Sequence, residues 1–299
     1  MTRRPIFWWL QAAGLRAALG LLRALGPVGA SNLGGAVARA IGPLLPVSRV
    51  ADRNLRLALP ELDAAARRVL VRGVWDNLGR TVAELPHVSG LAESESGPGW
   101  VLEGREQVDA LLRRRGGAIV VTAHTGNWEV IPRVAAQAGV RFGLVYRAAG
   151  NPVVDRLVNR LRRNAAGWEL PMFAKGAAGA RGMLAHLRAG GMLGMLVDQK
   201  MNDGIEAHFF GHPAMTASAA AALSLRFGCP VMTAFVERLG PARFRVVCGP
   251  PLDIAATGNR SADVLALTQA INDRVEAWVR ARPTQWLWLH RRWPKESTA

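Results

Sequence analysis

One stretch of the sequence decides the fold: Ala118-Ile-Val-Val-Thr-Ala-His-Thr-Gly-Asn-Trp-Glu129. Residues 118–121 form a short apolar run rich in β-branched side chains, which predicts a buried strand. The strand ends at His124, and the chain then turns through Gly126 into an apolar-periodic segment at 130–138. We therefore expect a strand, a tight turn and a helix in direct succession.

His124 and Glu129 can face each other only across this turn, because five residues correspond to about 140° around an ideal helix. Asn127 is a suitable N-cap, which puts Glu129 in the first turn of the helix. The imidazole would then lie at the carboxyl end of a strand with a carboxylate beside it. Open α/β sheets bind their ligands at that edge.

Such a pair suits general base catalysis, in which the carboxylate fixes the tautomer of the ring and stabilises the imidazolium. The nucleophile would be a hydroxyl of the substrate. A serine hydrolase is disfavoured because the sequence contains no Gly-x-Ser-x-Gly elbow. The same two residues also fit a capping histidine and a solvated first-turn acid, so the pair alone leaves both interpretations open.

The composition predicts a globular protein with an anionic partner. The chain has 299 residues, enough for one large domain or two modest ones. The net charge is +16, and all but three of the basic residues are arginine. This charge suits nucleic acid, an acidic membrane surface or an acidic carrier protein. Cys229 and Cys248 form no Cys-x-x-Cys pair and are expected to be core thiols, which fits a reducing compartment.

The first thirty residues favour a membrane surface. Residues 5–30 are mostly apolar, but the longest uncharged part, 5–15, is shorter than the ~20 residues that span a bilayer. Arg16 and Arg23 share one helical face. We expect a helix that lies in the interface of an anionic leaflet, with two tryptophans at the level of the headgroups. A buried amphipathic helix and an export signal are the alternatives.

Beyond residue 100 the sequence alternates between strand-like and helical segments, which predicts an α/β fold with a mostly parallel sheet and helices on both faces. A short Leu-Gly-Pro turn should join the last two strands as an antiparallel hairpin. The expected strands are 100–103, 118–122, 141–146, 168–173, 192–197, 230–236 and 243–248. The expected helices are 61–85, 105–115, 128–138, 152–164, 176–189, 214–227 and 261–281.

Further polar residues follow the strands of this sheet. Arg147 comes after the strand 141–146 and could hold a phosphate or a carboxylate. Asp198 and Gln199 end the strand 192–197, and Asp198 could orient a base, hold Arg147, bind a sugar hydroxyl or simply cap a turn. All three should emerge at the same edge as His124.

Two aromatic blocks need an explanation. Phe209 and Phe210 are expected to form a wall near the site, where an acyl chain could pack against them. The flanking His208 and His212 are four apart, but no third ligand is evident, so no metal is predicted. The segment 286–293 mixes tryptophans with basic residues; we expect it to meet the lipid interface rather than nucleic acid.

Together these blocks resemble a known family. His124-Thr-Gly-Asn-Trp-Glu129 looks like the His-x4-Asp/Glu motif of lysophospholipid-type acyltransferases. The wider frame is similar to the bacterial late acyltransferases of lipid A biosynthesis. The supporting blocks follow the family's order: Arg53-Asn-Leu55, Trp75-Asp-Asn-Leu-Gly-Arg80, Tyr146-Arg147 with Asn151-Pro152, Asp198-Gln199, Phe209-Phe-Gly211 and Trp288-Leu-His-Arg-Arg-Trp293.

The resemblance implies an O-acyltransferase that needs no cofactor and no metal. His124 would deprotonate a hydroxyl of a lipid A precursor, oriented by Glu129, and the hydroxyl would attack the thioester of an acyl-acyl carrier protein. Asn127, Arg147, Asp198 and Gln199 would bind substrate. His208 departs from the family's pattern, which leaves the acceptor open.

The implied organisation is an interfacial segment at 1–30 and one acyltransferase domain at 31–299, helical over 31–90 and α/β over 100–299. The implied location is the cytoplasmic face of the inner (plasma) membrane. Acylation of another glycolipid or an aminolipid is the alternative within the same chemistry. A basic protein that binds membrane or nucleic acid without catalysis is the alternative from a different class; steep salt dependence of nucleic-acid binding would distinguish it.

Overall fold

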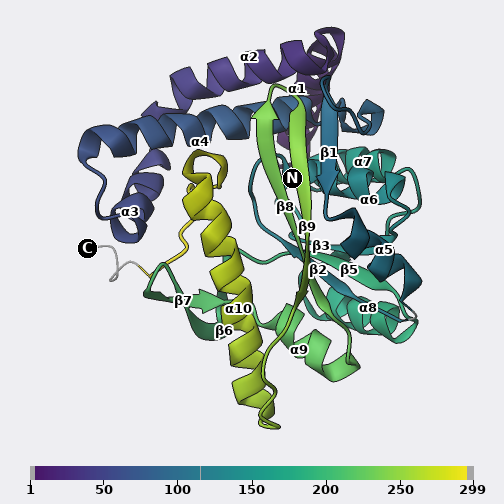
Figure 1. Cartoon of the computed structure of the whole chain (residues 1–299). Helices are drawn as coiled ribbons and strands as arrows, with labels where there is room; N and C mark the ends of the chain where they lie inside the picture. The colour runs from purple at the N-terminus through teal and green to yellow at the C-terminus, as the bar shows by residue number, and fades with distance from the viewer. Residues whose placement is uncertain (1–3, 115, 295–299) are drawn as a thin grey trace.

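A computed structural model describes residues 4–114 and 116–294, with side chains from Trp8 onward. Seven strands form its central sheet in the order β1-β9-β8-β2-β5-β3-β4 (Figure 1). Neighbouring strands are parallel except β8 and β9, which form the predicted antiparallel hairpin. The strands are β1 (Gly99–Glu103), β2 (Ile119–Thr122), β3 (Phe142–Tyr146), β4 (Met172–Ala174), β5 (Met192–Leu196), β8 (Val231–Gly240) and β9 (Arg243–Leu252). The predicted α/β class and the mostly parallel sheet are confirmed.

Helices cover both faces of the sheet because its central strands are apolar on both sides. In β2, Ile119 and Val121 point into the core on one face, whereas Val120 packs into the core on the other. The first face carries α8 (Ala177–Arg188), α9 (Ala219–Phe227) and α10 (Arg260–Ala281). The second carries α5 (Arg105–Arg113), α6 (Ile131–Gln137) and α7 (Pro152–Ala166).

A helical layer precedes the sheet and lies along one end of it (Figure 1). It consists of α1 (Arg4–Ala24), α2 (Gly26–Ile41), the 3-10 turn η1 (Gly42–Leu44), α3 (Ser48–Ala58) and α4 (Ala64–Glu84). The expected first helix is broken after Ala24, where Gly26 has φ of +66° and Pro27 follows. No helix among the described residues combines the length and the apolarity needed to cross a bilayer.

Gly34 and Gly79 bring α2 and α4 into direct backbone contact. A Cβ atom on Gly34 would lie only 2.4 Å from the carbonyl oxygen of Gly79, and one on Gly79 only 2.2 Å from that of Gly34. Neither position has room for a side chain. The two glycines therefore set the distance between the helices.

The structure differs from the predicted elements around residues 200–216. A second sheet, the hairpin of β6 (Lys200–Phe209) and β7 (His212–Thr216), lies where a loop and the start of a helix were expected, so α9 begins at Ala219 rather than at 214. Its two turn residues, Phe210 and Gly211, have φ of +53° and +74°, as a tight two-residue hairpin turn requires. The expected strand 168–173 is also shorter, since only β4 is extended.

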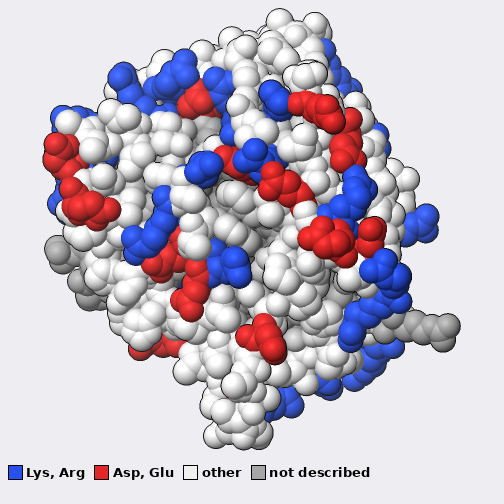
Figure 2. Space-filling model, in the orientation of Figure 1, with Lys and Arg blue, Asp and Glu red and all other residues white. Residues whose placement is uncertain are grey.

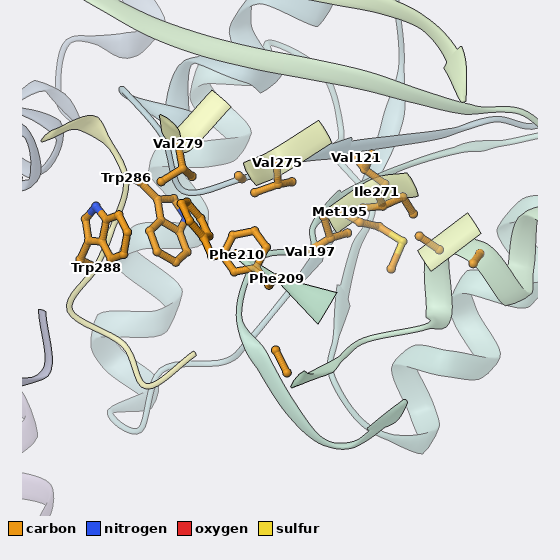
Figure 3. Packing of buried hydrophobic residues seen from close by; sticks show 14 of the residues in the cluster. Val121, Met195, Val197, Phe209, Phe210, Ile271, Val275, Val279, Trp286 and Trp288 are labelled. Carbon is orange, nitrogen blue, oxygen red and sulfur yellow. The ribbon is translucent and has the colours of Figure 1, made fainter. Parts of the chain in front are cut away.

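The prediction that the segment 286–293 meets lipid is wrong. Trp286, Trp288 and Trp293 are each at most 2% exposed and pack against Phe209 and Phe210 inside the core. Figure 3 shows Trp286 and Trp288 beside the two phenylalanines. The two phenylalanines thus form a wall, as expected, but of a core cluster on the α10 face of the sheet. In a sequence, aromatic residues next to arginines resemble a segment at the lipid interface. In this protein the tryptophan rings instead pack in the core.

We expect Gly34→Leu to lower the melting temperature clearly, because overpacking at a closed helix contact typically costs about 1–3 kcal/mol. Gly20→Ala on α1 is the matched control, since a Cβ there meets no atom within 4 Å. Thermal unfolding followed by circular dichroism measures both. A Gly34→Leu variant as stable as the control would contradict the inferred closeness of α2 and α4.

Candidate active site

The loop that carries the His-x4-Glu motif is held in a single conformation. After β2 the chain turns at Gly126, which has φ of +54° and whose Cβ would collide with the carbonyl oxygen of Val236 at 2.4 Å. The Gly126 carbonyl accepts hydrogen bonds from Asn77 and Thr81 of α4, both at 2.9 Å. Its N–H donates to the carbonyl of Gln285. Only glycine fits this position.

Asn127 caps the following turn, as predicted, because its side-chain oxygen accepts from the backbone N–H of Glu129 at 3.1 Å. The first turn is a 3-10 helix, η3 (Trp128–Val130), which leads into α6. The side-chain amide of Asn127 donates to Glu84 at 2.7 Å, and the residue is completely buried. Asn127 therefore positions the loop, and the expectation that it contacts substrate is not supported.

A buried carboxylate, Glu84 at the end of α4, joins this loop to the rest of the fold. Besides Asn127 it accepts hydrogen bonds from the Ser31 hydroxyl at 2.6 Å and the Ala242 N–H at 3.0 Å. Arg238 of β8 donates to both of its oxygens. The side chain of Glu84 is fully buried and that of Arg238 is 7% exposed. This role could not be predicted from the sequence, because Glu84 there is one acid at the end of an amphipathic helix.

His124 pairs with Asp198, not with Glu129. Its Nδ1 lies 2.8 Å from Oδ1 of Asp198, and its backbone N–H donates to Oδ2 at 2.9 Å. Trp286 Nε1 donates to the same oxygen at 2.7 Å. β5 and β2 are adjacent and parallel, so their carboxyl ends bring the two residues together. Of the roles that the sequence allowed for Asp198, orienting a base is the one that the geometry supports.

This arrangement affects the charge of Asp198 and the tautomer of the His124 ring. Burial alone would raise the pKa of Asp198, but the nearby His124 ring and its hydrogen bonds hold that pKa well below its ordinary value. A carboxylate on Nδ1 favours the tautomer with the proton on Nδ1. Nε2 is then the basic nitrogen of His124, and no described residue hydrogen-bonds it. The ring is partly exposed, at 14% of its side chain.

Glu129 forms a second ion pair, with Arg162 of α7. Arg162 Nε donates to one carboxylate oxygen at 2.8 Å and Nη2 to the other at 2.5 Å, while Trp128 Nε1 donates at 3.2 Å. Burial would raise the pKa of Glu129, but Arg162 and Trp128 bring about a net lowering. The expected hydrogen bond from Glu129 to His124 is absent among the described residues. Trp128 packs its edge against the His124 ring, with ring centroids 5.0 Å apart.

Arg162 was missed because three arginines follow one another closely at 160–163, and nothing in the sequence distinguishes one of them. Arg147 does follow β3 at the predicted edge, but its side chain is exposed and makes no ion pair with a described residue. Gln199 follows Asp198 and is half-buried. The structure therefore puts these two residues at the correct edge without giving either a role.

The Glu129–Arg162 pair lines a narrow crevice. Thr122, Trp128 and Tyr146 also line it, and most of its other lining residues are apolar. Phe142 separates it from a second apolar crevice between the sheet and α5 and α6. The two cavities measure about 40 and 50 Å³. An apolar ligand could enter only if the side chains around Phe142 moved.

The sequence as a whole is similar to that of known acyltransferases. The family model of the bacterial lipid A biosynthesis acyltransferases matches residues 1–295. The chain belongs to this family.

Individual relatives are distant. A phosphatidylinositol mannoside acyltransferase of Mycobacterium tuberculosis is 26% identical over 197 residues, 64% of this chain but only 60% of the relative's own length. The lipid A biosynthesis lauroyltransferase of Escherichia coli is 23% identical over 82% of this chain and 78% of its own. The myristoyltransferase of the same organism is 24% identical over 79% and 72%, respectively.

We expect the free energy of unfolding of Asp198→Asn to depend less on pH, at acidic pH, than that of the wild type. The pKa of Asp198 is depressed in the folded state, so the unfolded chain binds more protons once the pH falls toward the ordinary value near 3.8. Wild-type stability therefore falls as the pH falls through this range, by up to about 1.4 kcal/mol per pH unit from this one group. The variant should lack that contribution.

Urea unfolding at several pH values between about 5 and about 3, which bracket the ordinary pKa of a carboxyl group, gives the free energy of unfolding. Its slope against pH is compared between wild type and Asp198→Asn. Asp253→Asn, which removes an exposed carboxylate, is the control and should keep the wild-type slope. Equal slopes for wild type and Asp198→Asn would show that His124 does not hold Asp198 in its charged form.

Glu84→Gln should destabilise the fold by about 3–5 kcal/mol, because it leaves the buried guanidinium of Arg238 without its counter-charge. Glu93→Gln, which breaks the exposed pair with Arg105, is the control and should stay close to wild type. Equal melting temperatures for the two variants would refute the role assigned to Glu84.

Proposed function

We propose that the protein transfers a fatty acyl chain from acyl-acyl carrier protein to a hydroxyl of a lipid A precursor or a related glycolipid. The observation that carries the proposal is the oriented His124, whose Nδ1 is held by the buried Asp198 while Nε2 is directed to no other described residue. Family membership supports the transfer of an acyl group.

In the proposed reaction, Nε2 of His124 removes the proton from the acceptor hydroxyl as its oxygen attacks the thioester carbonyl carbon. The resulting imidazolium is stabilised by Asp198 through Nδ1. When the tetrahedral intermediate collapses, the carbon–sulfur bond breaks, and the imidazolium returns the proton to the departing thiolate. An ester and a free thiol result, with no acyl-enzyme intermediate.

Glu129 has a different place in this proposal from the one that the motif suggested. Its carboxylate is neutralised by Arg162, and both residues line the apolar crevice, whose mouth we propose they form. We infer that the pair sets the shape and polarity of the site around the thioester. Asp198, rather than Glu129, is the residue that orients the base.

The acyl chain is proposed to lie between the sheet and α6. Both crevices that Phe142 lines are mainly apolar, and the Glu129–Arg162 pair lines the nearer one. A chain bound there would place its thioester carbonyl at the mouth, near His124. Phe142 would then separate the near part of the chain site from the far part.

For the acceptor, Arg147 and Gln199 are the proposed contacts at the same edge of the sheet. An exposed guanidinium without an ion pair among the described residues suits a phosphate. The relatives carry the names of lipid A and phosphatidylinositol mannoside acyltransferases, so the acceptor class is proposed only as a glycolipid that offers a hydroxyl.

The site is proposed to work at the cytoplasmic face of an inner membrane. Exposed apolar side chains run along α1, α2 and η1, among them Trp9 (56%), Ile41 (55%) and Leu44 (82%). They extend well beyond residues 1–30, so the proposed interfacial region includes α2 and η1 as well. Such a surface next to arginines suits an anionic leaflet.

His124→Ala should reduce the transfer rate by about 10²–10⁴-fold, the usual contribution of a general base. Glu129→Ala is also expected to abolish most transfer, because it removes the ion pair with Arg162 at the proposed mouth of the crevice. The assay follows labelled acyl chains from acyl carrier protein onto a purified lipid A precursor, with circular dichroism to show that each variant is folded.

Near-wild-type turnover by His124→Ala would refute the mechanism. If the wild type itself transfers nothing to the precursor, a total lipid extract is offered and the acylated product identified by mass. An acylated product in that extract would support the proposed acyl transfer and identify a different acceptor.

A further inference from the structure

A groove lined by arginines lies between α3 and α4, away from the crevice. It encloses about 850 Å³. Five arginines line it, together with one acid, Asp52, and few apolar side chains: Arg49, Arg53 and Arg56 on α3, and Arg68 and Arg72 on α4. Over the rest of the face shown in Figure 2, away from α3 and α4, basic and acidic side chains are interspersed. The groove therefore concentrates charge of one sign.

Most of this charge is not neutralised within the protein. Asp52 is shared by Arg56 of the groove and Arg67 outside it. No carboxylate among the described residues lies within ion-pair distance of the other four groove arginines, and all five groove arginines are exposed. Like charges gathered on facing helices repel one another, and an anion placed between them relieves that repulsion.

The arrangement of the arginines suits an elongated anion. Positions 49, 53 and 56 follow helical spacing and form one stripe along α3, while 68 and 72 form a second stripe along α4. A helix that carries acidic side chains can lie between two such stripes and meet both. A flat membrane would meet only the rims of a concave groove, so the shape favours a protein partner.

The groove is also connected to the catalytic edge of the sheet. Asn54, next to Arg53 on α3, donates from its side chain to the carbonyls of Trp288 and His290 at 2.8 and 2.7 Å. His290 in turn lies with its ring against the Asp198 carbonyl. A partner seated in the groove is thus separated from the His124–Asp198 pair by one helix and one buried segment.

We propose that the groove between α3 and α4 is the docking site for an acidic helix of the acyl carrier protein that delivers the thioester. This inference rests on the proposed function, which supplies the donor. It adds where the donor binds, and it makes electrostatic attraction across the groove the main determinant of recognition.

The test compares the full-length double variant Arg53→Glu/Arg68→Glu with the control Arg260→Glu/Arg274→Glu on α10. Both variants change the charge equally at exposed positions without an ion pair to a described residue. Each is assayed with acyl-acyl carrier protein and with acyl-pantetheine, a donor of the same thioester that lacks the protein. Circular dichroism confirms that both are folded.

We expect KM for acyl-acyl carrier protein to rise by about tenfold or more in the groove variant, with kcat unchanged. Transfer from acyl-pantetheine should equal that of the wild type, and the control should behave as wild type with both donors. Added salt should raise the wild-type KM for the carrier protein but not for acyl-pantetheine.

Three results would overturn the inference, and they separate it from the proposed function. If the wild type uses acyl carrier protein and the groove variant keeps its KM, the donor stands and the groove is not its site. If the variant keeps that KM but loses binding to phosphatidylglycerol vesicles, the groove is a lipid site. If the wild type takes acyl chains from coenzyme A but not from the carrier protein, the proposed donor fails, and the inference with it.

Discussion

The buried carboxylate of Glu84 is the constraint on which the site depends. A charge removed from water is costly unless hydrogen bonds and a counter-charge replace its hydration. Here the partners come from α2, the β8–β9 hairpin and the His-x4-Glu loop, so the carboxylate is satisfied only when all three are in their final places. One residue thus links the helical layer, the sheet and the loop, and small displacements of any of them expose an unsatisfied charge.

Because Glu84 links these three parts, the His-x4-Glu loop is fixed by hydrogen bonds from several elements. Asn127 is held by Glu84 from one side and caps the next turn from the other, while the Gly126 carbonyl is bound by two residues of α4. His124 lies two residues before that carbonyl and has its own ring and backbone bound to Asp198. The imidazole is therefore preorganised before any substrate arrives, which is a condition for efficient base catalysis.

The sequence predicted the seven strands of the main sheet because buried parallel strands are continuous apolar runs with helices between them. It also placed His124, Arg147 and Asp198 at one edge, since parallel strands end together. It could not choose the partner of His124: Glu129 is five residues away and Asp198 is 74, and only the adjacency of β2 and β5 decides between them. Arg162 and Glu84 also act through partners distant in the chain, 33 residues away for Arg162 and at least 43 for the side-chain partners of Glu84, so neither could be recognised by spacing. The hairpin of β6 and β7 was missed because its polar first half and its proline resemble a loop.

The segment from Gln285 to Trp293 has a consequence for the order in which the site can assemble. It supplies Trp286 to the Asp198 carboxylate, the Gln285 carbonyl to the His-x4-Glu loop and the Leu287 N–H to the His124 carbonyl. The segment follows every described strand of the central sheet and belongs to none of them. The indole that holds Asp198 is therefore in place only once this segment has docked, and the ordering of the His124–Asp198 pair is tied to that docking.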